Sequence, residues 1–177
     1  MANDRRISYL RAIAHPVRLR ILSLLTGAEM SAAEIARELD LTHANASYHL
    51  RVLADAGEIV VAGEEKIRGG VAKRYRHPWD REEVTPSGGP ASGGDRSPSM
   101  RAVADELVRR FASRRSPSKG LLVDAEMWVT PEVWGEVLEH LDAASRAIHA
   151  NAQPPRTPGT THVNLTAGAF EMKATRQ

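Results

Sequence analysis

Two amphipathic helical patterns, Ser31 to Leu39 and Thr42 to Ala56, follow one another with a connector of only about three residues. Ser31 and Glu34 have the spacing of a capping box, which marks the start of the first helix. Thr42 can cap the second helix. Because so short a connector forces the two helices to cross at a wide angle, the pattern predicts a helix-turn-helix.

Further elements are expected on both sides of this pair. Helical spacing predicts helices over Asp4–Ala14 and Pro16–Thr26, the second starting at a proline. Downstream, Glu58–Ala62 and Val71–His77 are typical of strands, and the glycines between them favour a turn. The sequence therefore predicts a β-hairpin, or wing, attached directly to the second helix of the pair.

The second helix of the pair has a polar face without an acidic residue. Ala46, Leu50 and Leu53 follow helical spacing and are expected to face the core. The opposite face carries mostly short hydrogen-bonding side chains: Thr42, His43, Asn45, Ser47, Tyr48 and Arg51. A solvated helix face would more often mix Glu with Lys. This face suits insertion into a DNA major groove, where polar side chains read base edges.

Positive charge is concentrated rather than general. The chain holds 24 Lys and Arg against 22 Asp and Glu, so net charge alone does not favour nucleic acid. The excess lies in residues 1–80, with 12 basic and 10 acidic side chains, whereas residues 81–177 hold 12 of each. The predicted wing contains an acid-free run at residues 66–76, KIRGGVAKRYR. Its candidate phosphate contacts are Lys66, Arg68, Lys73 and Arg74. A merely solvated loop is the alternative.

The runs AHPVRLRILSLL and SAAEIARELDLTHANASYHLRVLADAGEIV, followed by a basic hairpin ending RYR, resemble the ArsR/SmtB family of winged helix-turn-helix regulators. The resemblance covers roughly residues 5–79. It implies a dimeric DNA-binding protein, often a repressor, whose operator affinity is altered by a metal or another signal. The resemblance carries the family's reading-helix pattern onto Thr42, Asn45, Ser47, His49, Leu50 and Arg51, of which Leu50 is structural.

The chain departs from the familiar metal sensors of that family because it contains no cysteine. Thiolate sensing of soft metals is therefore excluded. Glu136 and His140 stand four residues apart on a predicted helix, with His149 further along, but a solvated helix face is the favoured interpretation. We expect no metal site and no cofactor.

Residues 85–99 predict a flexible linker. Eleven of these fifteen residues are Pro, Gly or Ser, and none has a large apolar side chain, so the segment cannot offset the entropy of ordering. A long ordered loop is the alternative. The expected organisation is a winged helix-turn-helix domain at 1–80, a linker at 81–99 and a C-terminal domain at 100–177, in an α+β fold.

The C-terminal part is expected to be an α-β-α-β unit. Its predicted elements are a helix from Met100 to Arg115, a strand at Gly120–Val129, a helix that starts at Thr130 and a strand at His162–Met172. So small a unit commonly needs a partner to complete its core. Dimerisation would also give two winged helices the two-fold relation that a palindromic operator requires.

A small-molecule effector could also bind in this part. The candidate pocket residues are four aromatic and two acidic side chains: Phe111, Asp124, Glu126, Trp128, Trp134 and Phe170. The alternative, that an individual aromatic residue simply fills the core, is favoured by the helical and strand spacing. Trp128 is the exception, because it shares a predicted strand face with Asp124 and Glu126.

The sequence as a whole predicts a sequence-specific, dimeric DNA-binding transcriptional regulator that acts as a repressor in the cytoplasm. Its reading helix, 42–56, would lie in the major groove and its basic wing, 66–76, on the backbone or in the minor groove. A winged-helix protein-interaction module that does not bind DNA is the alternative. An enzyme is not expected, because the chain has no Gly-rich phosphate loop, nucleophile elbow or HExxH motif. No membrane span is expected either.

Overall fold

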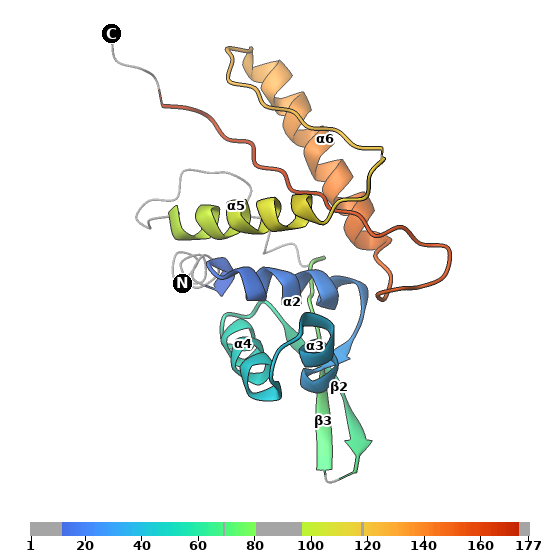
Figure 1. Ribbon diagram of the computed structural model, residues 1–177. Coiled ribbons are helices and arrows are strands. Elements are labelled where there is room, and N and C mark those ends of the chain that lie inside the picture. The colour runs from blue at the N-terminus through green and yellow to red at the C-terminus, as the bar shows by residue number, and fades with distance from the viewer. Residues whose placement is uncertain (1–11, 69, 81–96, 118, 174–177) are drawn as a thin grey trace.

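The computed structural model describes residues 12–68, 70–80, 97–117 and 119–173 (Figure 1). The elements, in chain order, are α2 (Pro16–Gly27), β1 (Met30–Ser31), α3 (Ala32–Leu39), α4 (His43–Asp55), β2 (Val60–Ile67), β3 (Gly70–Arg76), α5 (Ser97–Ala112) and α6 (Pro131–Ala150). Helices and an antiparallel sheet occur together, so the predicted α+β class is confirmed. The helix predicted at Asp4–Ala14 lies almost wholly outside the described residues.

The helices α2, α3 and α4 share one hydrophobic core with the start of the sheet. The largest fully buried side chains come from all three helices: Ile21, Leu25, Ile35, Leu50 and Leu53. The expected inward face of α4 is confirmed, since Ala46 is buried together with Leu50 and Leu53. This core fixes which face of α4 remains exposed.

The predicted N-caps are present at the start of both helices of the pair. Ser31 Oγ accepts a hydrogen bond from the Glu34 backbone N–H at 3.4 Å, and the Ser31 backbone N–H donates to Glu34 Oε2 at 2.7 Å. Thr42 Oγ1 accepts from the Asn45 backbone N–H at 3.2 Å. Asp40 turns the chain with a left-handed φ of 53°, a conformation that Asp tolerates better than most residues. The helix-turn-helix is thus built from local contacts.

The wing is longer than the sequence indicated. β2 extends to Ile67 and pairs with β3 in a register from Val60↔Arg76 to Ile67↔Gly70. The short strand β1, which the sequence did not predict, adds to the other edge of β3 through Met30↔Tyr75. The sheet order is therefore β1-β3-β2, and the hairpin projects away from the helices (Figure 1).

The C-terminal part differs from the expected α-β-α-β unit. The helices α5 and α6 are present, but residues 120–129 and 162–172 form no strand in this part of the described chain. Alternating side chains favour an extended backbone, yet a strand also requires a hydrogen-bonded neighbour.

The predicted linker also ends earlier than expected, because α5 begins at Ser97. Linker residues 81–96 lie outside the described residues.

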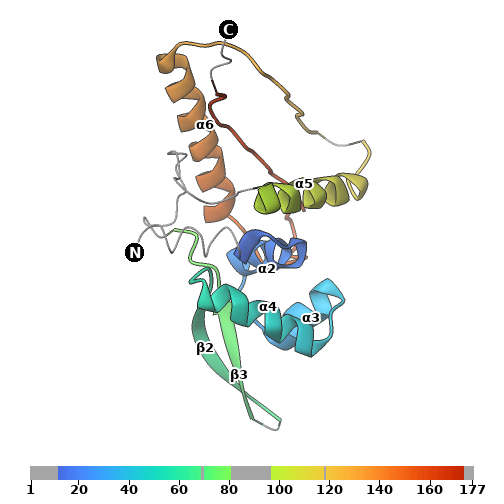
Figure 2. The ribbon, with the colours of Figure 1, turned by 90° about the vertical axis from the view of Figure 1, so that its left-hand side faces the viewer.

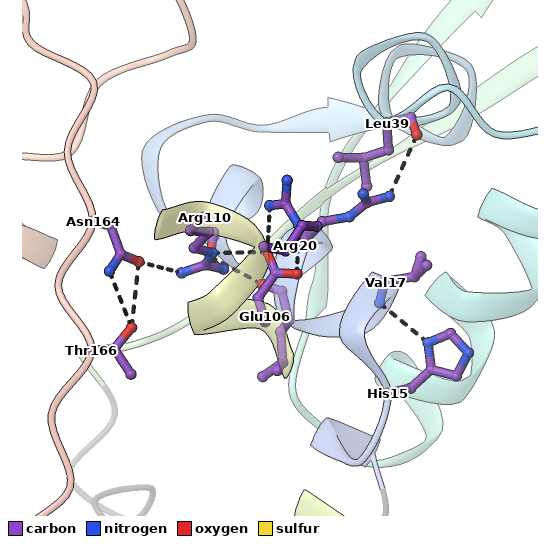
Figure 3. Close-up of polar contacts among 11 residues, drawn as sticks. His15, Val17, Arg20, Leu39, Glu106, Arg110, Asn164 and Thr166 are labelled. Atoms are coloured by element: carbon purple, nitrogen blue, oxygen red, sulfur yellow. Dashed lines mark hydrogen bonds and ion pairs between the residues drawn. The ribbon is translucent and has the colours of Figure 1, made fainter. Parts of the chain in front are cut away.

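The helix α5 packs against α2 of the winged helix. Glu106 is buried in this contact and accepts hydrogen bonds from Arg109 at 2.6 Å and from Arg110 at 2.8 Å. Although burial favours a higher value, these arginines hold the pKa of Glu106 below its ordinary range. Arg110 also donates to Ser23 of α2 at 3.3 Å and to Asn164 at 2.9 Å (Figure 3). One arginine therefore connects α2, α5 and the C-terminal segment.

The loop after α6 also contacts the winged helix. Arg156 forms an ion pair with Glu38 of α3 at 2.8 Å. A Cβ atom at Gly27 would stand 2.6 Å from the Gln153 carbonyl oxygen, so the loop backbone approaches α2 closely. The ring centroids of Trp79 and His149 lie 5.6 Å apart. The C-terminal part is thus attached to the winged helix at several points besides the linker.

Glu58 is an unexpected buried acid between α4 and the wing. It is 5% exposed, and its Oε2 atom has no hydrogen-bond partner. Burial raises the pKa of Glu58 to about 7. The backbone carbonyl of Glu58 accepts a hydrogen bond from His77 Nδ1 at 2.7 Å. The residue therefore joins the end of β3 to the end of α4 and carries a buried carboxyl group.

We expect Glu58→Gln to stabilise the protein increasingly as pH rises. Because the folded-state pKa is raised from 4.5 to about 7, the folded protein keeps a proton that the unfolded chain loses between these values. Wild-type Glu58 thus becomes destabilising over this range, whereas Gln does not titrate. Urea unfolding should show a difference between variant and wild type that grows by about 1–3 kcal/mol from pH 4 to pH 8. A difference that is independent of pH contradicts this assignment.

Candidate nucleic-acid interface

The exposed face of α4 carries the side chains that the sequence predicted. Thr42, His43, Asn45 and Arg51 are exposed, Ser47 is half-buried, and Tyr48 is 55% exposed. The first turn contains no acidic residue. The structure therefore brings hydroxyl, amide, imidazole and guanidinium groups together on one helix face. These groups can donate and accept hydrogen bonds at base edges and phosphates.

His49 lies on the opposite side of α4. It is 8% exposed, and its ring centroid lies 4.7 Å from that of His15 and 5.2 Å from that of Tyr48. His15 caps α2, because its Nδ1 atom accepts a hydrogen bond from the Val17 backbone N–H at 3.2 Å (Figure 3). The family resemblance placed His49 in the reading-helix pattern, but its side chain is buried and is not exposed for contact with DNA. His49 packs the N-terminus of α2 against the reading helix.

Both imidazoles of this pair favour the neutral form. Burial lowers the pKa of His49, and the charges of His15 and Arg18 lower it further. Burial and Arg18 likewise lower the pKa of His15. No sequence pattern marks this pair, because the two residues are 34 positions apart and meet only through helix packing.

The basic residues of the wing fall into two groups. Lys66, Arg68 and Lys73 are exposed on the projecting hairpin. Arg74 instead forms ion pairs with Glu34 at 3.1 Å and Glu65 at 2.9 Å, and it also donates to the Glu29 carbonyl. Its guanidinium group thus connects the wing to α3, a different role from the predicted phosphate contact. The run 66–76 lacks acids, but β2 places Glu64 and Glu65 opposite it.

The Glu34 carboxylate accepts hydrogen bonds both from the N-cap residue of α3, Ser31, and from Arg74 of the wing. Its Oε2 atom accepts from the Ser31 backbone N–H at 2.7 Å, from Ser31 Oγ at 2.8 Å and from Arg74 at 3.1 Å. Burial acts to raise the pKa of Glu34, but the hydrogen bonds from Ser31 and the charge of Arg74 hold it below its ordinary value. The carboxylate is therefore ionised at neutral pH and fixes the wing relative to α3.

The reading helix and the wing lie at one end of the molecule, whereas α6 lies at the other (Figure 2). The helix α2 lies between them and contacts both α4 and α5. The DNA-facing candidates are thus grouped at one end, away from α6, while the loop at Pro154–Pro155 lies beside α3 and Arg74.

The candidate effector-pocket residues are open to solvent. Phe111, Asp124, Glu126, Trp128 and Phe170 are exposed, with Trp128 at 93%, and Trp134 is half-buried. Side chains this exposed do not line an enclosed cavity within one chain. An open depression of about 390 Å³ lies elsewhere, against α3 and Pro154–Pro155.

The histidines of α6 bond to their own helix. His140 Nδ1 donates to the Glu136 carbonyl at 2.8 Å, and His149 Nδ1 donates to the Ser145 carbonyl at 2.7 Å. Within the described ranges, no three His, Cys, Asp or Glu side chains gather as metal ligands. No helix in those ranges is long and apolar enough to cross a membrane.

A family model described as a helix-turn-helix domain matches residues 13–60. The match covers the three helices α2, α3 and α4 and the connector between the last two. No curated protein matches the chain. The fold and the match together show a helix-turn-helix domain at residues 13–60, a kind of domain that many DNA-binding regulators contain.

The ion pairs of Arg74 predict a division of roles within the wing. Arg74→Ala removes contacts to two acids and one carbonyl, and we expect it to lower the free energy of unfolding by about 1 kcal/mol, as partly exposed ion pairs do. The matched control Lys73→Ala, at the next position of the same strand, should stay within about 0.5 kcal/mol of wild type. Urea unfolding at pH 7 measures both. Equal effects of the two substitutions contradict the division.

Proposed function

We propose that the protein is a dimeric, sequence-specific DNA-binding regulator that acts in the cytoplasm as a repressor. The observation that supports this most directly is the exposed polar face of α4, whose first turn holds no acidic residue, on a helix-turn-helix scaffold. Binding, rather than catalysis, is the role that this arrangement serves.

The helix α4 suits the major groove in size and chemistry. Its 13 residues span about 20 Å, and the groove of B-DNA, about 12 Å wide, admits one helix. Thr42 and Asn45 lie near the N-terminal end, the part of a recognition helix that contacts base edges. The amide of Asn45 can pair with adenine through two hydrogen bonds. Asn45 and Ser47 are therefore the proposed base-reading residues, and Arg51 is a phosphate contact.

The wing provides a second contact beside this helix. Lys66 and Arg68 lie at the hairpin end, and Lys73 is exposed further up β3. Cations in this position can neutralise phosphates or enter the minor groove. Arg74, held by Glu34 and Glu65, would orient the hairpin rather than contact DNA. A dimer would place two such units on a palindromic site, and occupancy of that site would block transcription.

We expect Asn45→Ala to weaken binding to the preferred site by about 1–3 kcal/mol, because a bidentate base contact is lost. Binding to unrelated DNA should change little. Fluorescence anisotropy with both DNAs measures the two affinities. Ala44→Ser, at an exposed neighbouring position, serves as the matched control. An equal loss on both DNAs would assign Asn45 to the backbone rather than to base reading.

Replacement of Lys66, Arg68 and Lys73 by Ala should reduce the salt dependence of DNA binding. The plot of log K against log salt has a negative slope, and each lost phosphate contact reduces the magnitude of that slope by about 1. The control replaces Arg101, Arg114 and Arg115, which lie outside the winged helix, and should leave the slope unchanged. An unchanged slope in the wing variant excludes the wing as a phosphate contact. Absence of any DNA binding by the wild type would instead support a protein-interaction module.

A further inference from the structure

Two C-terminal segments have the composition of strands but lack strand partners. These segments, residues 120–129 and 162–172, are called the two arms here. Every residue of the first arm is exposed, as is almost all of the second, and neither belongs to a sheet in the part of the chain that the structure describes. Extended segments with alternating apolar side chains become stable when a neighbouring strand satisfies their backbone groups.

The helix between the arms is also uncovered. None of the 20 residues of α6 is buried. Its apolar stripe includes Val133, Val137 and Leu138, each at least 40% exposed. Trp128 on the first arm and Phe170 on the second add two exposed aromatic rings. The exposed apolar side chains are thus gathered on α6 and the two segments that flank it, and large exposed apolar patches mark interaction sites.

We propose that a second copy of this chain covers this surface by exchanging arms. The first arm of each protomer would pair with the second arm of the other, and the resulting intermolecular sheet would pack against the stripes of α6. The proposal rests on the proposed dimer and specifies how that dimer is assembled. Together α6 and the arms exceed the ~20–30 residues per side that a standard interface uses.

The two arms are attached to different parts of the same protomer, and this favours pairing with the arms of a partner chain over pairing with each other. The first arm leads directly into α6 at Pro131. The second arm is held to the body by Asn164, which accepts from Arg110 at 2.9 Å, and its preceding loop is held by the Arg156–Glu38 ion pair. Both arms run from the α5 side toward the far end of α6 without meeting (Figure 2).

Symmetry favours a second copy over a different partner. An unrelated peptide strand would pair with one arm and leave the other uncovered. A two-fold related copy presents both missing strands at once, because each protomer supplies what the other lacks. The same contact also covers the apolar stripe of α6. The arms lie at the opposite end of the molecule from the reading helix, so this pairing leaves the DNA-facing surface accessible (Figure 2).

Cross-linking between introduced cysteines tests this pairing, since the chain has none of its own. A chain with Val123→Cys is co-expressed with a tagged chain carrying Leu165→Cys, and the mixture is treated with a short bifunctional maleimide. We expect a covalent heterodimer whose digest contains the 123–165 link. Substitution of Ile67→Cys, on the wing, for Leu165→Cys should abolish the heterodimer band.

Two results would overturn the proposal. One is an exclusively intrachain link in a chain that carries both cysteines, and the other is a dimer in solution without the 123–165 link. As a second measurement, light scattering should give the mass of a monomer for Trp128→Glu, while circular dichroism shows that the helical signal is kept. A dimeric mass for this variant contradicts arm exchange. A cross-linked dimer without DNA selectivity refutes the proposed function and leaves the arm exchange standing.

Discussion

The Oε2 atom of Glu34 joins two parts of the winged helix, the helix α3 and the wing. It accepts from the backbone and hydroxyl of Ser31, which starts α3, and from Arg74, which belongs to the wing. One carboxylate therefore fixes the first helix of the pair and the hairpin beside the reading helix. Hydrogen bonds to an ionised group are about twice as strong as neutral ones, so this small cluster orients two separate contact elements.

The sequence was sufficient to predict those features of the structure that depend on residues close together in the chain. The caps at Ser31 and Thr42 and the inward face of α4 were all predicted, because capping and helical spacing are local. The exposure of the polar face of α4 followed from the same spacing. The wing was recognised, but its length was not, since pairing across the hairpin extends β2 to Ile67.

Contacts between distant segments were the part that sequence could not predict. Arg74 looked like one more cation of a basic run, yet its partner Glu34 is 40 positions away. The packing of His15 against His49 and the burial of Glu58 arise in the same way from tertiary structure. In the C-terminal part the alternation of side chains predicted two strands, and this was wrong for the described residues, because strands need hydrogen-bonded partners that those residues do not provide.

In the proposed complex, two symmetry-related copies of α4 read the DNA sequence. Selection of bound fragments from a random DNA pool tests it most directly. We expect enrichment of an inverted repeat whose half-sites are centred about 10–10.5 base pairs, or a multiple of that spacing, apart. Recovery of fragments with no common sequence, or of a motif without two-fold symmetry, would contradict it.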